Sequence, residues 1–353
     1  MKINKIELAN FKKYIEHKEF EFNVSQPKDA VSDITLILGN NGSGKSSILQ
    51  AVAIVTATAS RENFTPDELD WPGFDYRSAS TGRMPPTIKC HYTFHAEEIE
   101  AIAEYASELQ EMGVKIHTPS QSENIRLSYS FDQRKSFASK GAADYFQFGG
   151  YQYAKRLSKV KPDKNILFER VGNIFWYTEQ RTSYSISNIL ESEPTKQLDY
   201  IRRFLASAYT FHVAVRDQGR ELKEGQFDFF NDFQQLYKRV FPDRSFVGSA
   251  PSFDKFEKSE APDFFLSDGH NQYELAEMSA GERAIFPILM DFARWNINHS
   301  IIIIDEIELH LHPPLQQALV RALPKLGKNN QFIITSHSDS VASMFSEEQI
   351  IRL

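Results

Sequence analysis

Residues 34–46 read ITLILGNNGSGKS, an apolar run followed directly by a glycine-rich turn. The run ITLIL (34–38) has no polar face, which is typical of a strand covered on both sides of its sheet. Residues 39–46 fit the pattern G-x-x-x-x-G-K-[ST], whose backbone N–H groups surround phosphate oxygens. The stretch ILQAVAIVTATA (48–59) predicts a buried helix after this turn. Strand, turn and helix together predict a phosphate-binding loop (Walker A) in an α/β protein.

The polar residues of this loop have expected roles toward ATP. Lys45 is expected to reach the β- and γ-phosphates, and the Ser46 hydroxyl to ligate Mg²⁺. The residues expected to bind ATP here are Asn40, Asn41, Gly42, Ser43, Gly44, Lys45, Ser46 and Ser47.

A second apolar strand, IIIIDE (301–306), ends in two acidic residues and resembles a Walker B motif. Ligands of open α/β sheets bind at the carboxyl ends of strands, where Asp305 can hold Mg²⁺ and Glu306 can orient the attacking water. The alternative to these catalytic roles is that Asp305 and Glu306 only cap the turn that follows the strand. His337, in QFIITSHS (331–338), follows another strand and can sense the γ-phosphate, although a lone histidine is often structural.

Residues 278–283, MSAGER, form a second small-residue loop before the helical stretch AIFPILMDFARW (284–295). Such a loop is an anion site, because free N–H groups and the helix dipole face outward. Pro287 lies inside this helix, where proline can introduce a kink.

The order of these four motifs resembles that of the ATP-binding-cassette (ABC) ATPases. In that family the second loop, the signature, closes on the γ-phosphate held by another subunit of a head-to-tail dimer. The resemblance implies that Ser279, Ala280, Gly281 and Glu282 contact the ATP of a second copy of this chain, in a homodimer or a higher oligomer.

Other stretches narrow the resemblance to the SMC/RecF-like and OLD-like AAA ATPases of prokaryotic defence and repair. KIELANFKKY (5–14) is similar to the SMC and RecF-like branch and implies that Asn10, Phe11 and Lys12 lie near the nucleotide. IELHLHP (307–313) resembles the dimer-crossing turn of the OLD-type and RecF-like families. Gln180, in WYTEQR, matches the Q-loop, which contacts Mg²⁺ and the attacking water, although a strand ending in Gln also arises without that role.

The resemblance implies an α/β fold of the ABC-type P-loop ATPase head, with a mostly parallel core sheet, an N-terminal antiparallel β subdomain and an inserted mixed α/β lobe. We expect core segments at 1–84 and 251–353, with the lobe and Q-loop at 85–250. The chain has no long heptad run, so we expect no coiled coil. It ends at Leu353, so we expect no Toprim domain of the OLD type.

Composition excludes several classes of protein. The chain has 353 residues, a formal net charge of −7 and one cysteine, Cys90, so it cannot form an intramolecular disulfide. No apolar run approaches the roughly 20 residues that span a bilayer. We therefore expect a soluble, cytoplasmic protein without a membrane partner. The net charge argues against general nucleic-acid binding, but the basic stretch 153–165 keeps contact with DNA or RNA open.

Together these features predict a Mg²⁺-dependent ATPase that dimerises around ATP and regulates a separately encoded effector, such as a nuclease, in anti-phage defence. The alternative is a RecF/SMC-like repair ATPase that binds DNA. A transporter subunit fits less well, because the interval between Lys45 and Ser279 is longer than in transporter cassettes. Aromatic residues of 85–250 are candidates for an effector-docking surface, or else for core: Tyr129, Tyr145, Phe146, Phe148, Tyr151 and Tyr153.

Overall fold

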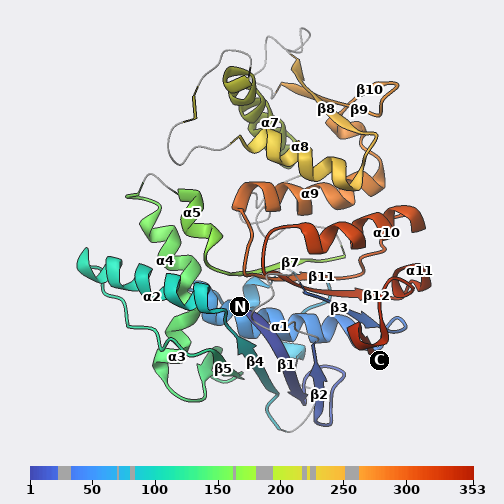
Figure 1. The fold of residues 1–353 in the computed structure, drawn as a ribbon. Helices are drawn as coiled ribbons and strands as arrows, with labels where there is room; N and C mark the ends of the chain where they lie inside the picture. The colour runs from blue at the N-terminus through green and yellow to red at the C-terminus, as the bar shows by residue number, and fades with distance from the viewer. Residues whose placement is uncertain are drawn as a thin grey trace.

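The computed structural model describes residues 1–22, 33–69, 71–79, 84–161, 164–179, 194–216, 221–222, 228–250 and 262–353 (Figure 1). Within these ranges the chain forms a five-stranded parallel sheet, a five-stranded antiparallel sheet and a three-stranded antiparallel sheet. None of the helices in these ranges has the length and apolar character that a bilayer crossing requires.

The parallel sheet is the centre of the molecule. Its order is β13-β3-β12-β11-β7, with bounds Ile350–Arg352, Asp33–Leu38, Gln331–Ser336, Ile301–Ile304 and Ile174–Tyr177. Along β11, Ile301 and Ile303 join one hydrophobic cluster, whereas Ile302 and Ile304 join the other. The alternation explains why the strand is apolar at every position, since each face of the sheet packs against a separate core.

Helix α1 (Lys45–Ser60) lies between the parallel sheet and the larger antiparallel sheet (Figure 1). Residues 48–60 of α1 are all buried, because a sheet covers the helix on either side. The antiparallel sheet has the order β2-β1-β4-β5-β6, with bounds Lys18–Glu21, Lys2–Ala9, Thr87–Thr93, Asn124–Ser130 and Lys135–Ala138.

Helices α9 (Ala280–Trp295) and α10 (Pro313–Ala322) cover the other face of the parallel sheet (Figure 1). Beyond α9 lie α7 (Pro194–Arg216), α8 (Phe229–Val240) and the small sheet of β8 (Ser245–Ala250), β9 (Asp263–Ser267) and β10 (Gln272–Glu274). Aromatic rings hold this part together: Phe233 lies 4.9 Å from Phe246 and 5.2 Å from Phe286 of α9, centroid to centroid. α9 continues as one helix through Pro287.

The remaining helices of the described chain are α2 (Ala96–Glu111), α3 (Ala142–Phe146), α4 (Gly150–Leu157), α5 (Lys164–Glu169) and α11 (Asp339–Ala342). Helix α2 packs against α4, α4 against α5, α3 against β6 and α11 against α10. Three of the aromatic candidates for docking, Tyr129, Phe148 and Tyr153, are buried in the core beside α1. The core alternative therefore applies to those three residues.

The parallel core sheet and the N-terminal antiparallel sheet confirm the predicted fold class. The domain bounds expected at 84/85 and 250/251 stay predictions, and strands pair across both of them. Ile6 of β1 pairs with Cys90 of β4 across the boundary at 84/85, and Phe246 of β8 pairs with Leu266 of β9 across the boundary at 250/251. Strand pairing over long sequence distances leaves no local signal, which is why composition did not reveal it.

Candidate nucleotide-binding site

The phosphate loop connects β3 to α1. Gly42 and Gly44 have φ values of +77° and +107°, a region that residues with a Cβ rarely adopt. A Cβ on Gly44 would also lie 2.7 Å from the Tyr14 hydroxyl. Helix α1 begins after Gly44 without a side-chain cap, which suits an anion at its N-terminus.

Lys45 and Ser43 give this loop the polar groups that a phosphate needs. The Lys45 Nζ donates to the carbonyl oxygens of Gly39 and Asn40, at 2.8 and 3.2 Å, so the ammonium group lies across its own loop. The Ser43 hydroxyl is buried and has no hydrogen-bond partner among the described residues. Phosphate oxygens would accept hydrogen bonds from both groups, so the loop fits the phosphates of ATP.

The segment after β1 contacts the phosphate loop through residues that sequence reasoning missed. Lys13 Nζ donates to the Gly42 carbonyl, and the Tyr14 hydroxyl donates to the Gly44 carbonyl at 3.2 Å. Both residues lie in the stretch KIELANFKKY, but sequence reasoning assigned neither a role, because they reach the loop only through the turn between β1 and β2.

Asn10, Phe11 and Lys12 lie in the turn after β1, and their expected closeness to the nucleotide stays a prediction. Phe11 is 0% exposed in the core beside α1, so its ring does not face a ligand. Lys12 donates to the Gln50 side chain on α1 at 2.7 Å. Asn10 has a φ of +54° and its N–H donates to the Ile15 carbonyl, so it shapes the turn.

Asp305 lies at the same edge of the sheet as the phosphate loop. The parallel register, with Ile304 opposite Ile334 and Ser336 opposite Leu38, brings the ends of β11, β12 and β3 together. The buried Asp305 carboxylate accepts from the Thr335 hydroxyl at 2.5 Å and from the Trp71 indole at 3.2 Å. Sequence reasoning missed both residues. Thr335 lies in QFIITSHS, where only His337 had an expected role, and Trp71 belongs to no motif.

Glu306 follows in the left-handed conformation, with φ +46°, and its N–H donates to the Thr335 hydroxyl at 2.7 Å. Thr335 therefore links both acidic residues to β12. Burial, together with the negative charges of Asp305 and Glu308, raises the pKa of the Glu306 carboxyl. A higher pKa makes Glu306 a stronger base toward an attacking water.

His337 begins the turn after β12, next to the start of the phosphate loop, where the Gly39 N–H donates to the Ser336 carbonyl at 3.3 Å. Its ring is 45% exposed, and its Nδ1 lies 2.8 Å from the Glu308 carboxylate. Gln180, the expected Q-loop residue, lies outside the described residues.

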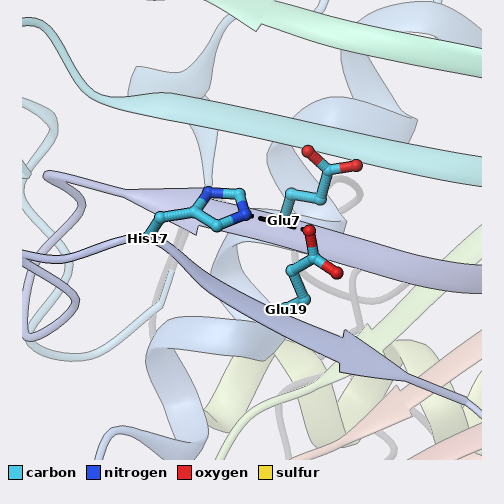
Figure 2. A group of neighbouring side chains, drawn as sticks. All are labelled: Glu7, His17 and Glu19. Atoms are coloured by element: carbon cyan, nitrogen blue, oxygen red, sulfur yellow. Dashed lines mark hydrogen bonds and ion pairs between the residues drawn. The ribbon is translucent and has the colours of Figure 1, made fainter.

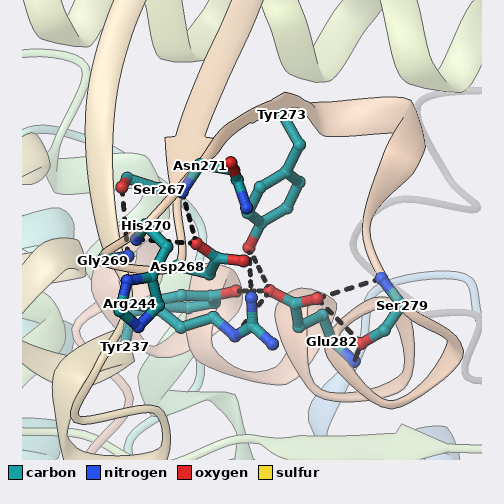
Figure 3. A network of polar contacts seen from close by, with 10 residues as sticks. All are labelled: Tyr237, Arg244, Ser267, Asp268, Gly269, His270, Asn271, Tyr273, Ser279 and Glu282. Carbon is teal, nitrogen blue, oxygen red and sulfur yellow. Dashed lines mark hydrogen bonds and ion pairs between the residues drawn. The ribbon is translucent and has the colours of Figure 1, made fainter.

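The signature loop forms a closed polar network (Figure 3). Ser279 caps α9: its N–H and hydroxyl donate to Glu282 at 2.9 and 2.7 Å, and its hydroxyl accepts from the Glu282 N–H at 3.3 Å. Glu282 also accepts from the hydroxyls of Tyr273 and Tyr237, at 2.5 and 3.0 Å, and pairs with Arg244 at 3.2 Å.

Glu282 is 2% exposed, so its carboxylate anchors the loop, and the expected contact of this residue with ATP stays a prediction. Burial alone would raise its pKa, but the hydrogen bonds from Tyr273, Ser279 and Tyr237 hold the pKa of this carboxyl below its usual value. Ser279 and Ala280 are exposed, whereas Gly281 is buried against α10.

Another group of ionisable side chains lies on the antiparallel sheet, where ligand atoms of Glu7, His17 and Glu19 fall within 4.8 Å of one another (Figure 2). Lys5 pairs with Glu19, and Lys89 lies 3.7 Å from Glu7. The two ammonium groups therefore balance the two carboxylates. The cluster has no net negative charge with which to attract a metal cation. We interpret it as surface ion pairing.

The basic stretch 153–165 is partly neutralised by acidic residues of the same chain. Arg156 pairs with Glu62 at 2.7 Å, and Lys161 pairs with Glu108 at 2.6 Å. These pairs weaken the interpretation of the stretch as a nucleic-acid contact.

The family model for the AAA ATPase domain matches residues 1–342 of the chain. The chain belongs to the AAA ATPase domain family. Among curated relatives, this AAA ATPase is 22% identical to the Retron Vc95 probable ATPase of Vibrio cholerae serotype O1 biovar El Tor, over 99% of this chain and 73% of that protein. It is 23% identical to the Septu protein PtuA of Bacillus mycoides (strain KBAB4), over 95% of this chain and 38% of that protein.

The Retron Ec83 probable ATPase of Escherichia coli is 35% identical over a shorter stretch, 28% of this chain and 21% of that protein. Among solved structures, the AAA ATPase resembles the SmcHead bound to the C-winged helix domain of ScpA, with a TM-score of 0.51 and 17% identity over 99% of this chain and 93% of that one. This likeness shows the SMC-head-like fold. The protein is thus an ATPase-family member related to retron and Septu defence ATPases.

Proposed function

We propose that this protein hydrolyses ATP in a Mg²⁺-dependent reaction at the edge formed by β3, β11 and β12. The phosphate loop would bind the triphosphate, with Lys45 moving from its own carbonyls onto the β- and γ-phosphates. Ser46 and Asp305 would hold Mg²⁺, which neutralises phosphate charge. Glu306 would take a proton from the attacking water, and His337 would contact the γ-phosphate.

One observation carries this proposal: the parallel register brings Asp305, Glu306 and His337 to the edge where the phosphate loop begins. Thr335 fixes the acidic pair by donating to Asp305 and accepting from Glu306. A base with a raised pKa beside a phosphate loop has the chemistry that hydrolysis needs.

We further propose that two copies close head to tail around ATP. The exposed Ser279 and Ala280 begin α9, where backbone N–H groups suit an anion presented by a second subunit. The names of the retron and Septu relatives support a role in anti-phage defence, in which ATP state controls a separately encoded effector such as a nuclease.

The test compares wild type with Glu306→Gln by calorimetric ATP titration, phosphate release and light scattering. We expect Glu306→Gln to bind ATP normally, to accumulate as a dimer with ATP and to turn over at least about 100-fold more slowly, because the general base is lost. The exposed pair partner Glu347 provides a control, and Glu347→Gln should behave as wild type.

Wild-type turnover in Glu306→Gln would remove Glu306 from the mechanism. Tight binding of DNA ends with a steep dependence on salt, and no effector copurifying in any nucleotide state, would favour the repair alternative.

A further inference from the structure

Glu308 is a buried acidic residue that sequence analysis did not single out, and its contact with His337 has so far been given no role. It lies in the turn after β11, and its side chain is 7% exposed. A single oxygen, Oε1, accepts from the His337 backbone N–H at 2.6 Å and lies 2.8 Å from the His337 Nδ1. The carboxylate thus contacts both the backbone and the ring of the histidine from a different strand end.

The turn is also held by backbone hydrogen bonds, without help from this side chain. Backbone hydrogen bonds already connect Ile307 to Thr335, Leu309 to Glu306 and Leu311 to Glu308, at 3.0, 2.9 and 3.0 Å. The neighbouring Ser338 is held separately, because its hydroxyl donates to Gln316 of α10 at 2.9 Å.

The second oxygen of Glu308 also argues against a purely stabilising role. Oε2 is buried and has no hydrogen-bond partner within the described parts of the chain. Burying a carboxylate oxygen without a donor lowers the free energy of unfolding. A glutamate in this position is therefore better explained by what it does to His337.

We propose that Glu308 is the positioning residue for His337. A carboxylate accepts but cannot donate, so the ring nitrogen facing it, Nδ1, must carry the proton. Nε2 then becomes the ring nitrogen presented to a ligand. The hydrogen bond from the His337 N–H to Glu308 holds the backbone from which the ring projects. The inference rests on the proposed function only for the identity of that ligand, the γ-phosphate of ATP.

The first test is independent of activity. The protein has 10 histidines, and ¹⁵N-histidine labelling with His337→Gln identifies the ring signals of His337. We expect wild type to carry the proton on Nδ1 and Glu308→Ala to shift toward the tautomer protonated on Nε2. Glu308→Gln keeps an acceptor oxygen but loses the charge, so its tautomer population should lie between those of wild type and Glu308→Ala. This variant keeps the test usable if the alanine variant fails to fold.

The second test is a double-mutant cycle on ATP turnover. Glu308→Ala and His337→Ala should each lower kcat roughly 10- to 100-fold, the loss typical of a hydrogen bond to a charged group, with KM for ATP changed less than about twofold. If Glu308 affects turnover through His337, and not through its charge beside Glu306, the double variant should be no slower than His337→Ala alone.

Unchanged His337 ring signals in Glu308→Ala, or fully multiplicative losses in the double variant, would overturn the positioning role. An inactive wild-type protein would instead refute the proposed ATPase activity, and the ring signals would still decide the role of Glu308.

Discussion

The phosphate loop and the signature loop both lead into a helix, yet the two helix N-termini are satisfied in different ways. Helix α1 follows Gly44 without a side-chain cap, and Lys45 donates to two carbonyls of its own loop. Helix α9 begins with a complete capping box between Ser279 and Glu282, which Tyr237 and Tyr273 extend into the α8 and β10 region.

The difference separates two kinds of anion site. An uncapped helix with a lysine beside it can rearrange around a phosphate, as binding of ATP to its own chain requires. A helix start that is already hydrogen-bonded internally is preorganised and exposes only a small surface, here Ser279 and Ala280. Such a surface suits contact with a phosphate that another subunit already holds.

The largest expected effect is on ATP turnover, when one subunit has a defective phosphate loop and the other a defective signature loop. Lys45→Ala and Ser279→Arg should each abolish ATP turnover as homodimers, since every composite site is defective. Mixed together, their heterodimer contains one site with both defects and one with neither, so phosphate release should reappear. If copies carrying different tags copurify, which shows that subunits exchange, while turnover stays absent, then the sites are not shared or must act together.

A smaller effect, on the stability of the fold, is expected when the hydrogen-bond network of the signature loop loses its shared acceptor. Glu282→Ala removes the acceptor of Ser279, Tyr237 and Tyr273 and leaves buried donors without a partner. We expect the free energy of unfolding in urea to fall by about 2–4 kcal/mol. ATP binding at the phosphate loop should be retained.

The exposed Glu347 again serves as the control, because Glu347→Ala removes a carboxylate paired at the surface and should leave unfolding unchanged. A loss of ATP affinity in Glu282→Ala as large as that in Lys45→Ala would contradict the separation of the two loops.

The smallest expected effect is a loss of ATP affinity when Lys13, at the edge of the phosphate loop, is replaced. Lys13 is exposed and contacts the Gly42 carbonyl, so Lys13→Ala should weaken ATP binding only about two- to fivefold, as for other exposed charged contacts. Fluorescence titration with a labelled ATP analogue measures this affinity. Lys18→Ala, on exposed β2, is the matched control, and an equal loss there would show a general charge effect.

Local sequence patterns were sufficient for much of the fold. The strands at β3 and β11, the helix at α1 and the start of α9 all carry their signal within a few neighbouring residues, as hydrophobic periodicity, glycine spacing or a cap. The phosphate loop, Asp305, Glu306, Ser279 and His337 could be named for the same reason. Their roles toward ATP and Mg²⁺ stay predictions until the variants are measured.

Tertiary structure alone decided which side chains face the site. Phe11 and Tyr14 lie in the same motif-like stretch, yet packing buries the Phe11 ring in the core and brings the Tyr14 hydroxyl to the phosphate loop. Glu282 is also buried, whereas Trp71 reaches Asp305 from a stretch without a motif. The pairing of Glu308 with His337 joins two strand ends 29 residues apart. Such contacts depend on the register of the parallel sheet and on long-range packing, and neither leaves a periodic trace in the sequence.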